Sequence, residues 1–137
     1  MSLFKVFDVA GSGMSAQTVR LNTTSSNLAN AQTSAATPEE VYKARHPVFA
    51  AIMDEYSSNN ASAGVQVKEI VESNAAPQKI YQPGNPNADD EGYIYKANVN
   101  VIEEMANMIS ASRSYQSNVE VMNTTKQLML RTLQLGQ

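Results

Sequence analysis

One histidine is the only imidazole that this chain offers for acid–base or metal chemistry. His46 lies directly before Pro47, in a stretch whose apolar residues favour a strand, and the sequence contains no cysteine. Familiar zinc sites need several histidine or cysteine ligands, and thiol catalysis and disulfides both need cysteine. We therefore predict a structural or solvent-facing role for His46, no zinc site and no thiol chemistry.

Three other groups of residues have the residue types of chemical sites but not their spacing. The acids at 89–91 precede Gly92, but the ligand spacing of a calcium loop does not follow. The Gly11-Ser12-Gly13 run lacks the preceding strand and the remaining glycine of a nucleotide-binding motif, so we expect a hinge near a helix start. Glu103 and Glu104 are adjacent, point in different directions on a helix and suit the positive end of its dipole. The sequence therefore predicts no catalytic residue, no cofactor and no metal.

The composition argues against two classes of partner. The chain has 137 residues, a net charge of −3 and a pI near 5.1, whereas nucleic acids and anionic membranes both favour basic patches. Its longest apolar run, 48–53, is too short to span a bilayer. Lys5 and Asp8 interrupt the N-terminus, so we expect no cleaved Sec-type signal peptide. We predict one domain with no nucleic-acid partner and no direct membrane insertion.

A long amphipathic helix is predicted over 98–135. Apolar residues recur every seven positions, and a second series four residues on is apolar at three of its five positions. Asn100 and Glu103 give a capping-box-like start, and Gly136 suits a stop. The first series is Val101, Met108, Tyr115, Met122 and Met129; the second is Met105, Ser112, Val119, Lys126 and Leu133.

A second helix is predicted over 3–31, where Phe7, Met14, Leu21 and Leu28 recur at heptad spacing. The run 22–27 consists of weak helix formers, so the order of this helix must depend on packing. A polar N-terminal tail is the alternative. Because its seam matches that of the C-terminal helix, we expect the two helices to pack on each other, with their outer faces free for assembly.

The middle of the chain reads as short strands and turns. Strand patterns occur around 41–53, interrupted by Pro47, and at 65–68, 79–81 and 93–96, with a phase shift at 70–71 that suggests a bulge. The stretch 56–64 has the composition of a loop. We predict a mainly α fold in which the N- and C-terminal long helices pair as a coiled-coil hairpin around a small β-rich insert. The predicted divisions are 1–33, 34–97 and 98–137.

Two terminal motifs carry a family resemblance. The segment 26–33 (SNLANAQT) and the stretch from Glu104-Met105 through 111–118 (ASRSYQSN) resemble the shared signatures of the bacterial flagellar rod and hook proteins. The segment 81–86 (YQPGNP), Gly92-Tyr93 and the ending 119–137 narrow the resemblance to the proximal-rod member of that family. Residues 34–63 match poorly, and Asn100 stands where the family usually has Asp.

The resemblance implies a structural, non-enzymatic subunit of the proximal rod of the flagellar basal body. Such a rod crosses the periplasm and transmits torque from the motor ring to the hook. The implied partners are other flagellar rod proteins, copies of the chain itself, motor-ring/rod adaptor proteins and the flagellar type III export apparatus, which exports family members without a cleaved signal. A weak N-terminal helix would then order at the assembly site.

On this view an assembly interface has two parts. A helix seam consists of Leu21, Leu28, Met108, Tyr115, Met122 and Met129, and polar contacts that fix subunit register come from Asn27, Asn30, Arg113 and Gln116. Two alternatives stay open. Another rod or hook component would differ in the segment 81–95, and a compact small-ligand-binding domain would be monomeric with fully protected termini.

Overall fold

The chain folds into two long helices, a β-hairpin and a small three-stranded sheet. The structure is a computed structural model that describes residues 3–52 and 64–135. In chain order the elements are α1 (Leu3–Asn30), β1 (Ser34–Ala35), β2 (Arg45–Ile52), β3 (Gly64–Glu72), β4 (Gln78–Tyr81), β5 (Tyr93–Lys96) and α2 (Val101–Leu135). The Gly136 stop and most of the predicted 56–64 loop lie outside the described residues.

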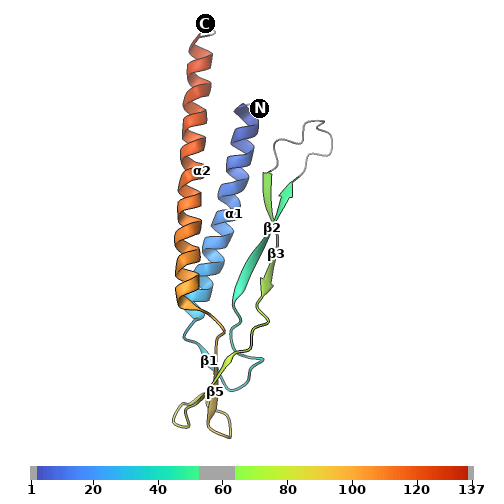
Figure 1. The fold of residues 1–137 in the computed structure, drawn as a ribbon, viewed down its shortest axis with the longest axis vertical. Coiled ribbons are helices and arrows are strands. Elements are labelled where there is room, and N and C mark those ends of the chain that lie inside the picture. Colours follow the sequence, from blue (N-terminus) through green and yellow to red (C-terminus); the bar gives the residue numbers. More distant parts are fainter. Residues whose placement is uncertain (1–2, 53–63, 136–137) are drawn as a thin grey trace.

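Helix α1 is the middle layer of an elongated molecule. The helices α1 and α2 run antiparallel, and the β2–β3 hairpin packs on α1 from the side opposite α2 (Figure 1). Helix α2 packs mainly on α1, and near its start Glu104 also lies 3.8 Å from His46 of β2. The β1–β5–β4 sheet closes the end at which α1 stops and α2 begins (Figure 1). The start of α1 and the end of α2 therefore lie toward the opposite end of the molecule.

The start of α2 confirms the predicted cap. Oδ1 of Asn100 accepts a hydrogen bond from the backbone N–H of Ile102 at 3.2 Å, so that a donor in the first turn is satisfied. Glu103 and Glu104 occupy that first turn, where the helix dipole favours negative charge. The helix begins at Val101, three residues later than predicted.

The weak helix formers of α1 are held by burial. The helix runs unbroken through Asn30, and Thr23, Thr24 and Asn27 are all buried. The hydroxyl of Thr23 donates to the carbonyl of Val19 at 2.8 Å, which gives this buried polar group a partner within its own helix. Tertiary packing thus decides the conformation of a segment whose intrinsic propensity is poor, and the alternative of a polar tail is wrong over 3–30.

The hairpin is antiparallel and carries one bulge. Pro47 pairs with Ile70 inside β2 without ending the strand, as an edge position allows. The register shifts between Val48 and Phe49, whose partners are Glu69 and Val67, so Lys68 is the extra residue. The sequence pattern predicted a bulge here, but at 70–71.

The predicted fold class is wrong. The described residues are 51% helical and 22% strand, and the strands form two separate sheets. The sequence suggested a helical hairpin with a small insert because the heptad pattern was strong and each strand was short. The structure instead makes the β2–β3 hairpin a full layer against α1, so the fold is mixed α and β.

Small residues in α1 let two neighbours approach closely. A Cβ on Gly13 would lie 2.8 Å from Nδ2 of Asn118 in α2, whereas a Cβ on Gly11 would make an ordinary 3.7 Å contact with Cε of Met122. Between them, Oγ of Ser12 accepts a hydrogen bond from the N–H of Val65 at 3.1 Å. The predicted hinge at Gly11–Gly13 is therefore wrong, because this run lies inside the unbroken helix α1 and contacts both α2 and β3.

The two glycines should respond differently to alanine. Gly11→Ala should raise the free energy of unfolding by about 0.5–1 kcal/mol, because alanine favours a helix and meets no obstacle. Gly13→Ala should fall short of this gain or destabilise the chain, because the Asn118 amide must move. Thermal unfolding of the purified chain followed by circular dichroism measures both. Equal stabilisation by the two changes would contradict the close crossing.

Candidate assembly interface

The face of α2 that packs on α1 is built from small and polar side chains. Glu104, Ala111, Asn118 and Thr125 recur every seven residues; three of them are buried, and Asn118 is half-buried. The half-buried methionines Met108, Met122 and Met129 lie beside them. Small residues in a seam allow the helix axes to come close, at the expense of apolar area. The seam therefore needs specific polar contacts to hold it.

Three of the five members of the second predicted heptad series lie outside this seam, whereas Ser112 and Val119 are half-buried. Met105 is 53% exposed, Leu133 is 69% exposed, and Lys126 is also exposed. The sequence pattern favoured that series because it is more apolar than the series Glu104, Ala111, Asn118 and Thr125. The helix turns its small and polar series inward instead, so a large share of its apolar side chains faces outward.

A polar hub centred on Asn27 joins α1, α2 and the start of β2. Nδ2 of Asn27 donates to the carbonyl of Arg45 at 2.8 Å and to Oε2 of Glu104 at 3.0 Å. Its Oδ1 accepts from the hydroxyl of Tyr42 at 2.8 Å and from the N–H of Arg45 at 2.9 Å. Asn27 is 0% exposed, and all four of its amide hydrogen-bonding sites are used. Ile94 and Asn27 are the largest fully buried side chains among the described residues.

Charged groups surround the hub. Glu104 is 3% exposed, and its Oε1 lies 3.8 Å from Nδ1 of the half-exposed His46. The guanidinium of Arg45 binds Glu72 across the hairpin at 3.0 Å and lies 5.6 Å from the ring centroid of Tyr42. His46 thus contacts the one buried carboxylate of the hub. This placement fits the structural role that was predicted for it.

A second asparagine ties the linker before α2 to the hairpin. Oδ1 of Asn98 accepts from the N–H of Ala44 at 2.7 Å, and its Nδ2 donates to the carbonyl of Ala75 at 2.7 Å. The N–H of Ser73 also donates to the carbonyl of Ala44. Between the two helices, the guanidinium of Arg20 in α1 donates a hydrogen bond to Oδ1 of Asn107 in α2 at 2.8 Å. Polar contacts at several positions along the molecule therefore hold α1 against α2 and the hairpin against the segment before α2.

Several apolar side chains on the outward side of α2 have no partner in the part of the chain that the structure describes. Near its start, Ile102 is 80% exposed, Ile109 is 54% exposed and Met105 is 53% exposed. Near its end, Leu130 and Leu133 are exposed to a similar degree. Exposed apolar area of this extent along one element is typical of an interaction surface.

The hairpin adds a second apolar area. Five large apolar side chains on β2 and β3 are at least 37% exposed: Val48, Phe49, Ile52, Ile70 and Val71. These strands have no further strand beside them in the described part of the chain. Both the helix side and the hairpin side of the molecule therefore present apolar residues outward.

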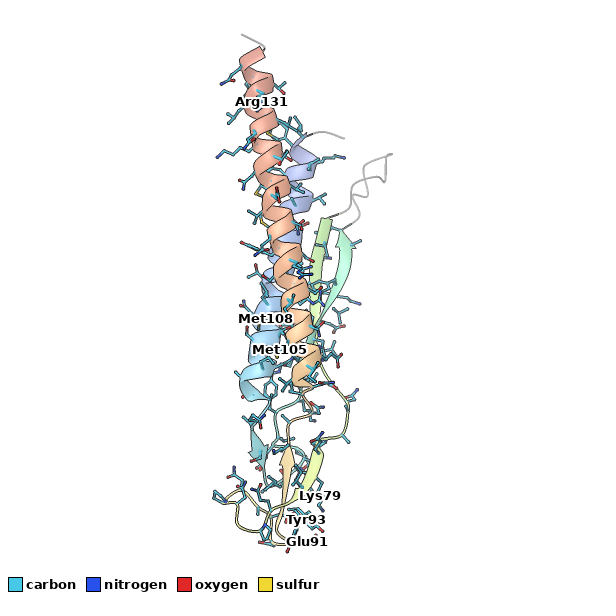
Figure 2. The ribbon with its side chains drawn as sticks, turned by 60° about the vertical axis from the view of Figure 1, so that its left-hand side comes forward. Lys79, Glu91, Tyr93, Met105, Met108 and Arg131 are labelled. Carbon is cyan, nitrogen blue, oxygen red and sulfur yellow. The ribbon has the colours of Figure 1, made fainter. Side chains whose placement is uncertain are left out.

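The small sheet carries an aromatic and basic cluster at the closed end of the molecule (Figure 2). Nζ of Lys79 lies 4.1 Å from the ring centroid of Tyr93, and the Tyr81 ring meets Tyr93 edge to face at 5.1 Å. Hydrogen bonding to the side chain of Tyr95 is the main cause that raises the pKa of Lys79 above its ordinary value. The cluster joins side chains of β4 and β5, and β5 leads the chain into α2.

The structure places the predicted interface residues in three settings. Asn27 is fully buried, and Asn30 donates to the carbonyl of Ser26 within α1. Half-buried positions within or near the helix pair are Leu21, Leu28, Met108, Met122 and Met129. Arg113 and Gln116 are exposed, and Tyr115 is 37% exposed. Contact with other subunits stays a prediction for all ten residues.

Sequence reasoning missed three residues of the hub. Glu104 was assigned to the helix dipole alone, and Tyr42 and Arg45 were read only as part of a strand. One signal was present: the seven-residue series from Glu104 contains no bulky apolar side chain, which suits the inside of a tightly packed helix pair. The partners of Asn27 come from segments 15 to 77 positions away, and no local pattern encodes such distances.

Over 3–52 and 64–135, no group of three or more His, Cys, Asp or Glu side chains is arranged to hold a metal ion. No helix in those ranges is long and apolar enough to cross a membrane. The exposed apolar side of α2 is the candidate interaction surface among the described residues.

Comparisons with known proteins point to one family. A family model described as "Flagella basal body rod protein" matches residues 7–37, and one described as "Flagellar basal body rod FlgEFG protein C-terminal" matches residues 90–135. The chain is 47% identical to the flagellar basal-body rod protein FlgC of Salmonella typhimurium and 49% identical to that of Yersinia enterocolitica. It is 39% identical to FlgC of Buchnera aphidicola subsp. Acyrthosiphon pisum. Each alignment covers 100% of both chains.

Removing the hub amide should weaken the fold. Asn27→Ala leaves Arg45, Tyr42 and Glu104 without their buried partner, and each such group costs about 1–3 kcal/mol. Asn27→Asp should be at least as damaging, because it sets a second carboxylate against Glu104. Chemical denaturation of the purified chain measures the loss of unfolding free energy.

Two further variants make this test specific. Asn22→Ala, an exposed asparagine on the same helix, should change the unfolding free energy little. Adding Glu104→Gln to Asn27→Asp should recover part of the stability, because the new amide donates to the new carboxylate. Equal effects of Asn22→Ala and Asn27→Ala would contradict the hub.

Proposed function

Because the chain belongs to the FlgC family of flagellar basal-body rod proteins, we propose that it forms part of the proximal rod and carries torque from the motor ring toward the hook. The chain is a structural subunit of the flagellar basal-body rod, and it assembles with other rod components. Its contribution is mechanical and non-enzymatic. The single observation that supports this most is the apolar outward side of α2.

The outward side of α2 favours a protein that assembles with other subunits over one that functions as a monomer. Ile102, Met105 and Ile109 lie along one side of the helix, and no element among residues 3–52 and 64–135 covers them. Burying each such side chain against a neighbour contributes about 1.5–3 kcal/mol, so a few contacts per subunit offset the cost of association. The chain's own fold does not need these side chains, and a subunit interface does.

The geometry of the helix pair suits a load-bearing element. The 35 residues of α2 form one unbroken helix, and α1 pairs with most of its length. The hub at Asn27 and the contact between Arg20 and Asn107 resist sliding of one helix along the other. Force applied to the outer side of α2 is thereby passed to the whole subunit.

We place the ten predicted interface residues at two levels of this assembly. Asn27 and the methionines of the seam hold the subunit together, whereas Arg113, Tyr115 and Gln116 are exposed on α2 and reach neighbouring subunits. Motor-ring/rod adaptor proteins and the flagellar type III export apparatus are further proposed partners. Export without a cleaved signal and a location crossing the periplasm complete the proposal.

Ile109→Asp tests this function without touching the seam. Ile109 is 54% exposed, so the variant should keep the unfolding midpoint of the purified chain while losing incorporation into basal bodies and motility. A carboxylate at a buried subunit contact is costly because it has no partner there. Met122→Asp should also abolish swimming, but by separating the helix pair.

The matched control is Lys68→Glu on β3, an exposed residue outside α2. Cells carrying this variant should swim normally, and their basal bodies should contain the chain. Normal motility of the Ile109→Asp strain, with the variant present in its basal bodies, would contradict the role of the outer side of α2.

A further inference from the structure

One methionine on the outward side of α2 is open to solvent. Met105 is 53% exposed, whereas the other methionines within 3–52 and 64–135 are half-buried: Met14, Met108, Met122 and Met129. Met105 and Met108 lie close together in the first part of α2 (Figure 2), but only Met105 belongs to the outward side. Its position on the helix therefore separates this thioether from the others by its access to dissolved reagents.

The sulfur of Met105 can accept an oxygen atom, which its neighbours on the outward side cannot do. Ile102 and Ile109 carry only saturated hydrocarbon, and the chain has no cysteine that would react first. With hydrogen peroxide, a lone pair of the sulfur attacks a peroxide oxygen and the O–O bond breaks. The leaving hydroxide takes the proton of the transferred oxygen and becomes water. The sulfur is thereby oxidised by two electrons to the sulfoxide, and the peroxide is reduced.

The sulfoxide has the opposite polarity to the surface on which it forms. A methionine side chain is flexible and apolar and adapts to irregular apolar contacts, whereas its sulfoxide is polar. The side chains of Ile102 and Ile109, which are exposed on the same side of the helix, have no donor for the new oxygen. Burying a polar group without a hydrogen-bond partner is costly. The oxidised surface is therefore better hydrated than covered by an apolar neighbour.

We infer that Met105 is an oxidation site that controls incorporation of the subunit: peroxide converts its thioether to the sulfoxide before assembly, and the sulfoxide form is excluded from the rod. The inference rests on the proposed function, in which the outward side of α2 meets neighbouring subunits. An incorporated copy is protected, because the neighbour that covers Met105 also keeps peroxide from its sulfur. A methionine sulfoxide reductase supplied with a dithiol restores the thioether and releases water.

The fold of the subunit does not depend on the Met105 side chain. The next residue toward the N-terminus, Glu104, is buried and accepts a hydrogen bond from Asn27, whereas Met105 faces outward. Oxidation of Met122, which packs toward Gly11 of α1, would instead place a polar oxygen within the helix pair. Loss of assembly without loss of stability therefore distinguishes oxidation of Met105 from general damage to the chain.

Peptide mass spectrometry of the purified chain tests the chemical half of the inference. After graded exposure to hydrogen peroxide, Met105 should gain oxygen several-fold faster than Met108, Met122 and Met129, because its side chain is the most accessible. The unfolding midpoint measured by circular dichroism should stay unchanged while Met105 alone is modified. Oxidation of Met105 at the same rate as the half-buried methionines, or more slowly, would overturn the inference.

Competition inside one cell tests the assembly half. Cells produce two differently tagged copies, the unsubstituted chain and Met105→Leu, which keeps an apolar side chain but has no sulfur. The ratio of the tags in newly built basal bodies is measured with and without peroxide, at a dose that converts Met105 to its sulfoxide in unassembled copies. Because both copies share the cell, damage to other components affects them equally. Peroxide should shift the ratio several-fold toward Met105→Leu.

The control pairs the unsubstituted chain with Met108→Leu, and here peroxide should not change the ratio. A third copy, Met105→Gln, carries a polar amide and should be incorporated several-fold less than Met105→Leu even without peroxide. An unchanged ratio for Met105→Leu, an equal shift for Met108→Leu, or equal incorporation of Met105→Gln and Met105→Leu would overturn the inference and leave the rod function standing. Absence of every tagged copy from basal bodies would instead contradict the proposed function.

Discussion

The buried amide of Asn27 is the constraint on which the rest of the subunit depends. It joins two helices and the start of a strand through four hydrogen bonds, and none of these partners is close to it in sequence. Because the surrounding core is made largely of alanine, little apolar burial is available to hold the layers. Directed polar contacts therefore set the register of α1 against α2 and of the hairpin against both.

A core built from small and polar side chains explains why the bulky apolar side chains lie on the outside of the subunit. A tight seam of small and polar side chains lets α1 and α2 approach closely, and the bulkier isoleucines, leucines and valines are left on the outside. A solitary protein would gain nothing from that arrangement, whereas a subunit that must bind neighbours along its length needs it. Under the proposed function, fold stability and assembly use different faces of the same helix.

The sequence predicted elements better than it predicted their arrangement. The cap at Asn100, the strand at 93–96 and the long C-terminal helix follow from local chemistry, and each was read nearly to the residue. The predictions of the fold class and of the α2 face that packs on α1 were wrong. A heptad pattern identifies the most hydrophobic face of a helix, and in α2 that face is not the one that packs on α1. Here Glu104, Ala111 and Thr125 face inward through contacts with distant residues. The hub could not be predicted from the sequence, because nothing in the residues next to Asn27, Tyr42 and Arg45 indicates that their side chains meet.

The most direct test of the account is site-specific photo-crosslinking in swimming cells from two positions on α2. A methionine-sized diazirine probe is placed at Ile109, which faces outward, or at Met122, which packs toward Gly11 of the same chain. The account predicts adducts between subunits from position 109 and adducts within the chain from position 122. Adducts between subunits from position 122, with none from position 109, would mean that the helix pair opens on assembly and would contradict the account.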